Sequence, residues 1–462
     1  DSLIENKTWS IVARPPPEVN VVSSKWVFRK KTRLDGRVRY KSRLVARGFT
    51  QRKGEDYFYT YSPTLSLTSF RALLAIASEM DLNLYNIDIT TAFLYGKVEG
   101  CNIYMEIPDG FSRHAEYQNL DLNNKVLKLR KTIYGLKQSA AAFNEELSKT
   151  LIQAGLRALL GDACVFVDPE SKSTLIVATY VDDCVILYKE KKQLKRLLEI
   201  IGKRFKYKDI GKLDTCLGID VLQVPGGYAI SQSRYIKRMG EKYEITCSKR
   251  AKTPLPAHIK LDEYQHSAKV DSTTYRSMIG AVLYASGATR PDVTFAISKL
   301  SQYSADPRLV HMNALKRLIR YMMNTCEYKM IYTKTGKLPA VQAYADASFG
   351  SDLKTGKSIS GYLIFIAGAP VLWMSKRQRC VTTSTSESEY VALSGACREI
   401  IYIHGMLTEL GLERILLNKT GAPPEIKLGC DSASAIAVSE KPGLSLKSRS
   451  IRISYHNVRS CV

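Results

Sequence analysis

The stretch that decides the fold reads Leu175-Ile176-Val177-Ala178-Thr179-Tyr180-Val181-Asp182-Asp183-Cys184-Val185-Ile186-Leu187-Tyr188. Two apolar, β-prone runs flank a short polar centre, which predicts a tight β-hairpin with two adjacent carboxylates at its tip. Like charges beside buried strands are costly unless a cation lies between them, and a divalent metal is the natural partner. An Asp-Asp pair is also ordinary turn chemistry, so this stretch alone leaves both interpretations open.

A third acid occupies a similar setting upstream. Residues 84 to 89 predict a strand that carries Asp88 near its end, and Thr90 or Thr91 can cap a helix that begins near Ala92. In that arrangement Asp88 can hold a metal while backbone N–H groups face a phosphate. Alone, Asp88 would be interpreted as a cap or turn residue. Three such carboxylates together suit two-metal phosphoryl or nucleotidyl transfer.

Length and charge narrow the class of protein. The chain has 462 residues, 45% of them apolar, and this length predicts about three domains. The 68 basic and 44 acidic residues give a net charge of +24, which favours nucleic acid as a partner over an anionic membrane surface. The most apolar run, residues 362 to 374, is shorter than the roughly 20 residues that span a bilayer, so no membrane partner is expected. The 10 cysteines lack any Cys-x-x-Cys pair, which favours a reducing, intracellular setting.

Residues 25 to 46 predict a second hairpin, with its turn at Asp35-Gly36. Its second strand alternates so that four cations share one face: Arg37, Arg39, Lys41 and Arg43. This row can grip a phosphate backbone or a nucleoside triphosphate. A solvated edge strand guarded by charge is the alternative.

Helices are predicted over residues 65 to 80 and 190 to 205. Between 226 and about 270 the periodic pattern weakens, which predicts a domain boundary there. A later helical stretch places Lys316, Arg317 and Arg320 beside apolar residues. It suits a helix lying on a nucleic-acid duplex, and a plain amphipathic helix is equally consistent with it.

A second group of acids follows residue 338. Asp346 is predicted to end a strand, Glu389 to lie in the first turns of a helix that begins at Ser384, and Asp431 to close another strand. Acids so placed could converge on metal at one sheet edge. Each also has a structural alternative, because Ser386-x-x-Glu389 is a capping box and Asp431 can N-cap a helix.

Several motifs occur in a fixed order: residues 41 to 51, 56 to 63, 88 to 96 and 103 to 111, Tyr134-Gly135-Leu136-Lys137-Gln138, Tyr180-Val181-Asp182-Asp183, and residues 275 to 292. Together they resemble the reverse transcriptases of copia-type (Pseudoviridae-like) LTR retrotransposon Pol polyproteins. Tyr344-Ala345-Asp346, Ser386-Glu387-Ser388-Glu389-Tyr390 and Cys430-Asp431-Ser432 resemble the ribonuclease H domain of the same family.

The resemblance implies a multidomain fold that mixes α+β and α/β parts: a right-hand polymerase (fingers, palm, thumb) followed by a ribonuclease H-like α/β domain. Fingers and palm are expected in residues 1–225, the thumb or connection in 226–337, and the ribonuclease H-like domain in 338–462. We expect this last domain to be truncated, with a fourth carboxylate beyond Val462, in a segment cut from a longer polyprotein.

The implied activity is RNA-directed and DNA-directed DNA synthesis. Asp88 and Asp182, assisted by Asp183 and the Ile89 carbonyl, would hold two Mg²⁺ ions, with Mn²⁺ as an alternative. The nucleotide-binding residues implied by resemblance are Lys41 and Arg43 for the triphosphate, Phe93 for exclusion of a 2′-hydroxyl, and Gln138 for the template or incoming nucleotide. Asp346, Glu389 and Asp431 would hold metal for cleavage of the RNA strand in a hybrid.

The implied partners are an RNA template, a DNA primer, RNA–DNA hybrid and dNTPs. Flanking protease and integrase domains and a homodimer are also expected by resemblance. The implied location is a cytoplasmic virus-like particle, with the nucleus later in the cycle.

The chain departs from the family pattern at three places, and two of them, the block at residues 139 to 143 and Arg452, favour an alternative, a catalytically decayed or host-adopted nucleic-acid-binding remnant. Residues 139 to 143 read Ser-Ala-Ala-Ala-Phe where the family has Ala-Pro-Arg-Ala-Trp, Tyr95 replaces an Asn, and Arg452 replaces an acid. The intact acids Asp88, Asp182 and Asp183 favour the enzyme.

Overall fold

The structure is a computed structural model that describes residues 2–32, 38–171, 174–246, 250–257, 259, 261–262, 266–335, 341–412, 426–440, 451 and 453–460. It divides into two compact units. The first comprises Asp1–Leu65, Tyr85–Ser171 and Leu175–Gly211, and the second comprises Ser66–Leu84, Lys172–Thr174 and Lys212–Val462. Both units mix helices and strands, as the sequence predicts.

The centre of the first unit is a six-stranded sheet in the order β12-β5-β11-β10-β9-β8. Its strands are β5 (Asn83–Ile89), β8 (Arg157–Ala158), β9 (Val165–Val167), β10 (Leu175–Tyr180), β11 (Asp183–Tyr188) and β12 (Tyr207–Lys212). The predicted hairpin is confirmed, because β10 and β11 pair antiparallel from Leu175 opposite Tyr188 to Tyr180 opposite Asp183. Only two residues, Val181 and Asp182, are left to form the turn.

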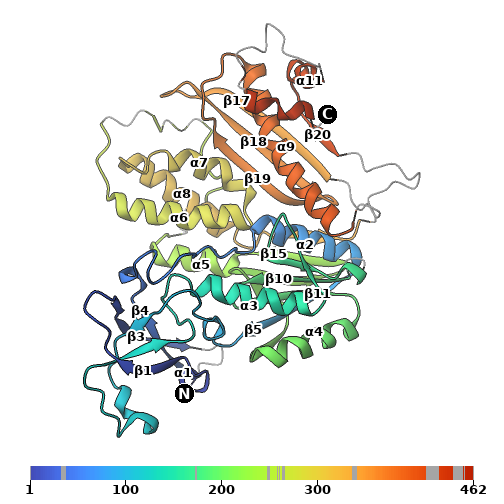
Figure 1. The fold of residues 1–462 in the computed structure, drawn as a ribbon. Coiled ribbons are helices and arrows are strands. Elements are labelled where there is room, and N and C mark those ends of the chain that lie inside the picture. Colours follow the sequence, from blue (N-terminus) through green and yellow to red (C-terminus); the bar gives the residue numbers. More distant parts are fainter. Residues whose placement is uncertain are drawn as a thin grey trace. The chain divides into compact units, whose positions relative to one another are not determined.

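Two helices cover one face of this sheet, α3 (Ser139–Gln153) and α4 (Lys191–Arg204) (Figure 1). Alternate strand residues such as Ile87, Val177 and Ile186 pack against Phe143 of α3 and Ile201 of α4, all fully buried. The helix predicted over residues 190 to 205 is thereby confirmed. Its amphipathic spacing leaves the lysines and arginines on the solvent side.

The hairpin predicted over residues 25 to 46 is confirmed as β3 (Ser24–Thr32) paired with β4 (Val38–Ala46). Its turn, including Arg37, and the side chain of Arg39 lie outside the described residues. Beside it lies a four-stranded sheet, in the order β1-β7-β6-β2. The remaining elements of the first unit are α1 (Ser2–Glu5), β1 (Trp9–Ala13), β2 (Val21–Val22), β6 (Tyr104–Met105), β7 (Lys125–Leu129), and the short 3₁₀ turns η1 (Gly48–Thr50), η2 (Ala92–Leu94), η3 (Phe111–Arg113), η4 (Ala115–Tyr117) and η5 (Pro169–Ser171).

The second unit begins with α2 (Leu67–Met80), which confirms the helix predicted over residues 65 to 80. A four-stranded sheet follows, with β13 (Thr215–Cys216), β14 (Ile219–Val224), β15 (Gly227–Ser231) and β16 (Met330–Thr333) in sequential order. The secondary structure continues past residue 226, and the domain boundary expected from that point stays a prediction. Val224 pairs with Gly227, so Pro225 and Gly226 form a hairpin turn and the buried strand β15 continues beyond it.

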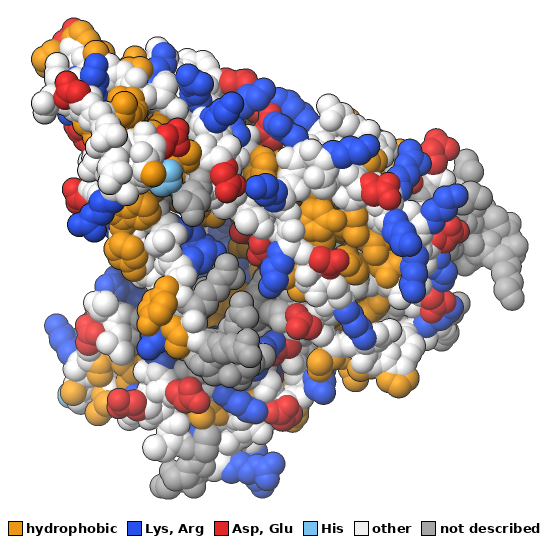
Figure 2. All heavy atoms as spheres, turned by 90° about the horizontal axis from the view of Figure 1, so that it is seen from below, with side chains coloured by type: hydrophobic (Ala, Val, Ile, Leu, Met, Phe, Trp, Pro, Cys, Tyr) orange, Lys and Arg blue, Asp and Glu red, His pale blue; other side chains and the backbone are white. Residues whose placement is uncertain are grey.

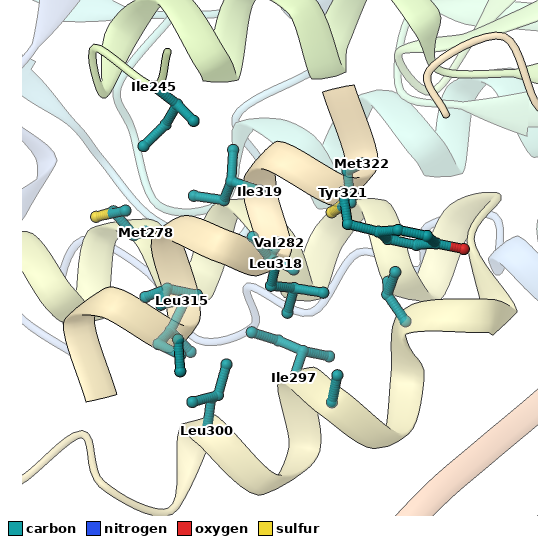
Figure 3. Close-up of a cluster of buried hydrophobic side chains, with 14 of the residues drawn as sticks. Ile245, Met278, Val282, Ile297, Leu300, Leu315, Leu318, Ile319, Tyr321 and Met322 are labelled. Carbon is teal, nitrogen blue, oxygen red and sulfur yellow. The ribbon is translucent and has the colours of Figure 1, made fainter. Parts of the chain in front are cut away.

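Helices make up the next part of the second unit: α5 (Ser233–Lys242), α6 (Ser272–Ala288), η6 (Pro291–Val293), α7 (Thr294–Ser301) and α8 (Leu309–Asn324). Figure 3 shows Val282 of α6, Ile297 of α7 and Leu318 of α8 pointing into one buried cluster. This apolar core holds the helices together.

No helix in the described part of the chain is long and apolar enough to cross a membrane.

The second unit ends in a four-stranded sheet ordered β19-β18-β17-β20. Its strands are β17 (Val341–Asp352), β18 (Lys357–Ile366), β19 (Ala369–Arg377) and β20 (Lys427–Gly429), followed by α11 (Ala433–Glu440) and η8 (Ile453–Ser460). Helix α9 (Thr385–Glu409) packs along β17 and β18 (Figure 1). The prediction that Asp346 ends its strand is wrong, because pairing with β18 carries β17 on to Asp352.

A buried arginine ties α2 to this sheet and to α6. The Arg71 guanidinium donates to the carbonyls of Val371, Gly287 and Ala288 and lies 4.1 Å from the centre of the Trp373 ring. Burial lowers the pKa of Arg71 to about 10. The three accepting carbonyls compensate the desolvation of the charge, which makes Arg71 part of the structure of the second unit.

Candidate active sites

The hairpin site consists of Asp88, Asp182 and Asp183, all in the first unit. The Ile89 N–H donates to the Asp182 carbonyl at 2.8 Å, so the end of β5 lies directly beside the turn of the β10–β11 hairpin. Val181 has a φ of 55°, in the left-handed region that β-branched residues rarely adopt. Such strain costs about 1–3 kcal/mol and persists where the surroundings fix the conformation.

The carboxylates of the hairpin site act on one another. Burial, then the charge of Asp182, then that of Asp88 raise the pKa of Asp183 to about 6. The pKa of the Cys184 thiol is also raised, chiefly by burial and then by the three acids. Asp182 and Asp183 follow Asp88 by 94 and 95 positions in the sequence, yet the charge of Asp88 reaches Asp183 in the fold. Their role as metal ligands stays a prediction. A divalent cation would relieve this repulsion.

The cap predicted after Asp88 is wrong. Thr91 has a φ of 55° and caps nothing with its side chain, because its hydroxyl donates to the Thr90 carbonyl at 2.7 Å. The chain forms only the single 3₁₀ turn η2 there. Backbone N–H groups of a long helix are therefore not available beside Asp88 as a phosphate site.

Phe93 and Arg43 both contact the aromatic ring of Tyr134. The Phe93 ring lies edge-on to Tyr134, with centroids 4.8 Å apart, and the Arg43 guanidinium lies 5.0 Å from the centre of the same ring. Lys41 lies two residues along β4, on the face that carries Arg43. The structure thus brings two of the predicted nucleotide-binding residues, Phe93 and Arg43, together at Tyr134. Sequence reasoning had placed Tyr134 only in a motif.

Gly135 explains how Tyr134 reaches this position. Its φ is +93°, and a Cβ there would lie 2.1 Å from the Ala46 carbonyl oxygen. The Ala46 N–H in turn donates to the Tyr134 carbonyl at 2.8 Å. Only glycine combines this backbone angle with so close an approach to β4.

Gln138 is held at both ends of its amide. Its Oε1 accepts from the Gln51 amide at 3.0 Å, and its Nε2 donates to the Asp56 carbonyl at 2.8 Å. Gln51 Oε1 also accepts from the Lys137 N–H at 2.8 Å. Gln51 is therefore a positioning residue that sequence reasoning missed, since no sequence spacing links partners 87 positions apart.

Two departures from the family pattern lie among the described residues of the first unit. Tyr95 is buried, its hydroxyl accepts from the Lys206 N–H at 2.8 Å, and its ring lies 4.9 Å from that of Phe205. Ala141 and Ala142 line a cavity of about 580 Å³. The third departure, Arg452, lies outside the described residues.

The sheet-edge site consists of Asp346, Glu389 and Asp431, all in the second unit. Tyr344 of β17 pairs with Gly429 of β20 in a parallel ladder, so Asp346 and Asp431, each two residues further on, lie at the same level. Glu389 of α9 accepts the Ala347 N–H at 3.1 Å. Burial, then the charges of Asp346 and Asp431, raise the pKa of Glu389 against the effect of that hydrogen bond.

The structural alternatives for the sheet-edge acids are not adopted. Helix α9 is capped by Ser384, whose Oγ accepts the Glu387 N–H, and Glu387 accepts from the Thr383 N–H and hydroxyl. Helix α11 is capped by Ser432, whose Oγ accepts the Ala435 N–H. Glu389 and Asp431 are therefore not the caps of these helices.

The donor set fits divalent metal at both sites. At the hairpin site, three converging carboxylates supply oxygen ligands of the type that Mg²⁺ takes. At the sheet-edge site, Oε2 of the buried Glu389 has no hydrogen-bond partner among the described residues. Ligand atoms of Glu389, Cys430 and Asp431 lie within 4.8 Å of one another, and Cys430 had not been identified from the sequence as a candidate ligand.

The cations of α8 are engaged in the protein itself. Arg317 donates to the Thr253 carbonyl and hydroxyl, and Arg320 donates to the Thr246 carbonyl at 2.8 Å. These hydrogen bonds support the interpretation of α8 as an amphipathic helix that fixes the neighbouring segment. Lys316 is exposed.

Comparisons with known proteins agree with the sequence motifs. Residues 6–257 match the family described as Reverse transcriptase (RNA-dependent DNA polymerase). The chain is 35% identical to the Retrovirus-related Pol polyprotein from transposon RE1 of Arabidopsis thaliana, over 99% of this chain and 30% of the relative. It is 32% identical to the corresponding polyprotein from transposon TNT 1-94 of Nicotiana tabacum, over 100% of this chain and 34% of the relative. The chain thus spans about a third of these polyproteins.

Two further relatives bear on family and fold. The putative transposon Ty5-1 protein of Saccharomyces cerevisiae is 31% identical over 68% of this chain and 100% of its own length. The foamy viral protease-reverse transcriptase solved with RNA/DNA hybrid is 14% identical with a TM-score of 0.50, covering 99% of this chain and 50% of that one, a likeness of fold alone. The chain belongs to the reverse transcriptase (RNA-dependent DNA polymerase) family, in its copia-type retrotransposon branch.

Proposed function

We propose that this chain is an RNA-directed and DNA-directed DNA polymerase that works by two-metal nucleotidyl transfer and carries an associated ribonuclease H domain. The observation that carries the proposal is the convergence of Asp88, Asp182 and Asp183, with a pKa of about 6 at Asp183. A site that concentrates negative charge in this way is suited to divalent cations and, through them, to phosphate.

Members of this family use divalent metal ions. Asp88, Asp182 and the Ile89 carbonyl would hold two Mg²⁺ ions here, with Asp183 assisting and Mn²⁺ as the alternative. When bound, such ions lower the pKa of the primer 3′-hydroxyl and neutralise charge on the triphosphate. The Ile89–Asp182 hydrogen bond fixes the two strands that present these ligands.

The remaining roles are proposed on family resemblance, and the contacts of Phe93 and Arg43 with Tyr134 support them. Arg43 and Lys41 would neutralise triphosphate oxygens from β4. The Phe93 ring, packed against Tyr134, would block a 2′-hydroxyl and so select dNTPs. The amide of Gln138 is bonded at both ends, which would hold it in place for a contact with the template or the incoming nucleotide.

The ribonuclease H activity is assigned to Asp346, Glu389 and Asp431, which would hold metal for cleavage of RNA in a hybrid. An antiparallel β19-β18-β17 sheet with the parallel strand β20 and the helix α9 supports this assignment. We propose fingers and palm in residues 1–225, thumb or connection in 226–337 and ribonuclease H in 338–462. The compact units cut the chain elsewhere, at Gly211, and join α2 to the second unit.

The proposed partners are an RNA template, a DNA primer, RNA–DNA hybrid and dNTPs. The net charge of +24 supports a polyanionic partner. On the face drawn in Figure 2, Lys and Arg side chains are spread widely and interspersed with acidic ones. Flanking protease and integrase domains, a homodimer and a cytoplasmic virus-like particle with a later nuclear stage are proposed on family resemblance alone.

The second candidate is a decayed or host-adopted nucleic-acid-binding remnant. The altered block at residues 139 to 143 is the observation in its favour. Within that block, however, Phe143 is buried in the core, and Ser139 is buried and donates to the Ile133 carbonyl at 2.5 Å. The altered residues thus fit the fold around the hairpin site, which supports the enzyme.

Primer extension on an RNA template with dNTPs and Mg²⁺ tests the proposal, with the Asp182→Asn variant as the comparison. Extension by the wild type and its loss in the variant, with primer–template binding unchanged, would establish the polymerase. Tight, salt-sensitive binding without extension by either protein would refute it and favour the binding remnant.

A further inference from the structure

Cys430 places a sulfur atom inside the sheet-edge site. The Sγ of Cys430 and one carboxylate oxygen each of Glu389 and Asp431 lie within 4.8 Å of one another. The same Sγ accepts the Ser432 N–H at 3.4 Å, which fixes the thiol at the start of α11. Magnesium prefers oxygen ligands alone, whereas a sulfur ligand favours softer ions.

A second observation points to a cation at this place. Glu389 is only 8% exposed; one of its oxygens accepts the Ala347 N–H at 3.1 Å. Its other oxygen, Oε2, is buried and has no hydrogen-bond partner within the described residues. A buried carboxylate oxygen is unfavourable unless a donor or a metal ion satisfies it.

We propose that Glu389, Cys430 and Asp431 form a three-ligand site for a thiophilic divalent ion, with Zn²⁺ as the natural ion of this class. The inference rests on the proposed ribonuclease H site, because Glu389 and Asp431 are shared with it. Cys430 adds a sulfur ligand, which favours softer ions such as Zn²⁺ over Mg²⁺. The fourth position of the zinc tetrahedron stays open to solvent or substrate.

The spacing suits this ion. Zinc–sulfur and zinc–oxygen distances near 2.3 and 2.1 Å place tetrahedral ligands about 3.5 Å apart. Atoms within 4.8 Å of one another need to approach by at most about 1.3 Å to reach this separation. Binding replaces the S–H bond by a sulfur–metal bond and releases the proton to solvent, with no change of oxidation state.

Zinc bound in this way has a consequence for the proposed cleavage of hybrid. It occupies two of the acids that would hold Mg²⁺, so micromolar Zn²⁺ should inhibit hybrid cleavage in the presence of excess Mg²⁺. The Cys430→Ser variant, which keeps an oxygen acceptor for the Ser432 N–H, should resist that inhibition.

The test is a Cd²⁺ titration of the full chain, followed by the ultraviolet absorption band of the cadmium–thiolate bond. Wild type, Cys430→Ser and Cys326→Ser are compared. Cys326 is the matched control, because its Sγ lies 3.6 Å from a single carboxylate oxygen of Glu327 and it belongs to no metal-binding group among the described residues. We expect Cys430→Ser to weaken the tightest Cd²⁺ binding at least tenfold and to lose its band, while Cys326→Ser matches the wild type.

Unchanged Cd²⁺ affinity and absorption in Cys430→Ser would overturn the proposal. Glu389→Gln, with the thiol intact, should also weaken Cd²⁺ binding and keeps the proposal testable if Cys430→Ser does not fold. Cys430-dependent Cd²⁺ binding without any Mg²⁺-dependent hybrid cleavage would support the metal site and refute the ribonuclease H. Mg²⁺-dependent hybrid cleavage without Cys430-dependent Cd²⁺ binding would support the ribonuclease H and refute the metal site with Cys430.

Discussion

The hairpin site and the sheet-edge site collect three acids each, in different ways. The hairpin site takes two acids from one tight turn, and one backbone hydrogen bond from Ile89 to Asp182 secures the third. The sheet-edge site takes each acid from a different element and leaves a carboxylate oxygen of Glu389 buried without a partner. The difference shows that adjacency in sequence can build most of one site, while the other depends wholly on tertiary packing.

The largest effect we expect is the separation of the two proposed activities, DNA synthesis and hybrid cleavage, by single substitutions. Asp88→Asn should reduce primer extension about a thousandfold, since a lost metal ligand removes several kcal/mol of charge stabilisation. Hybrid cleavage should stay within about twofold of the wild type, since the sheet-edge residues are untouched. Parallel extension and cleavage assays measure this.

Asp346→Asn is the control, with the opposite expected pattern. A loss of both activities in either variant would contradict two independent sites.

The next effect concerns the loop that holds Tyr134 and Gly135 against β4. Gly135→Ala should lower the free energy of unfolding by about 3 kcal/mol, because the new Cβ meets the Ala46 carbonyl at a positive φ. Gly155→Ala is a matched control, with a φ of +92° and no atom within 4 Å of the added Cβ. It should cost only about 1 kcal/mol.

Urea unfolding measures the free energy of unfolding of both variants, and primer extension measures their activity. Equal losses of stability would mean that backbone conformation alone, and not the close approach to β4, makes glycine necessary at position 135.

The sequence predicted what depends on local pattern. Alternation and turn residues sufficed for the β10–β11 and β3–β4 hairpins, and apolar periodicity sufficed for α2 and α4. Asp88 was grouped with Asp182 and Asp183 because three carboxylates in such settings suit a two-metal site. The hairpin site was therefore largely predictable.

The failures have physical reasons. Val224 and Gly227 pair across a turn whose Pro and Gly resemble a linker, so β15 was missed. The continuation of β17 past Asp346 is imposed by its partner β18. Neither the bond between Gln51 and Gln138 nor the approach of Cys430 to Glu389 leaves a periodic signal, because each joins elements far apart in the chain.

A smaller effect concerns pH and the hairpin site without metal. Asp183 has a pKa of about 6 in the folded chain and about 3.9 when unfolded. Between pH about 4 and 6 the folded chain therefore binds more protons than the unfolded chain. The free energy of unfolding falls as the pH rises through this range and stays low above it. Asp183→Asn removes this loss and should stabilise the metal-free chain at pH 7.5 by about 1–2 kcal/mol after solvent screening.

Urea unfolding at pH 5 and 7.5, with and without Mg²⁺, measures this effect. Glu389→Gln should act in the same direction at the sheet-edge site, because the pKa of Glu389 is also raised. If the wild-type chain became more stable between pH 5 and 7.5 and Asp183→Asn did not, the repulsion among the acids of the hairpin site would be contradicted.

The smallest effect separates capping from metal binding at the sheet-edge site. The sequence contains two overlapping Ser-x-x-Glu patterns, at Ser384–Glu387 and Ser386–Glu389, and the structure uses the first. Ser384→Ala should therefore cost about 1 kcal/mol in unfolding free energy, and Ser386→Ala close to nothing. Thermal or urea unfolding of this matched pair decides between them. If Ser386→Ala were the costlier change, Glu389 would be the partner of a helix cap, and the sheet-edge site would lose its buried acid to an ordinary structural role.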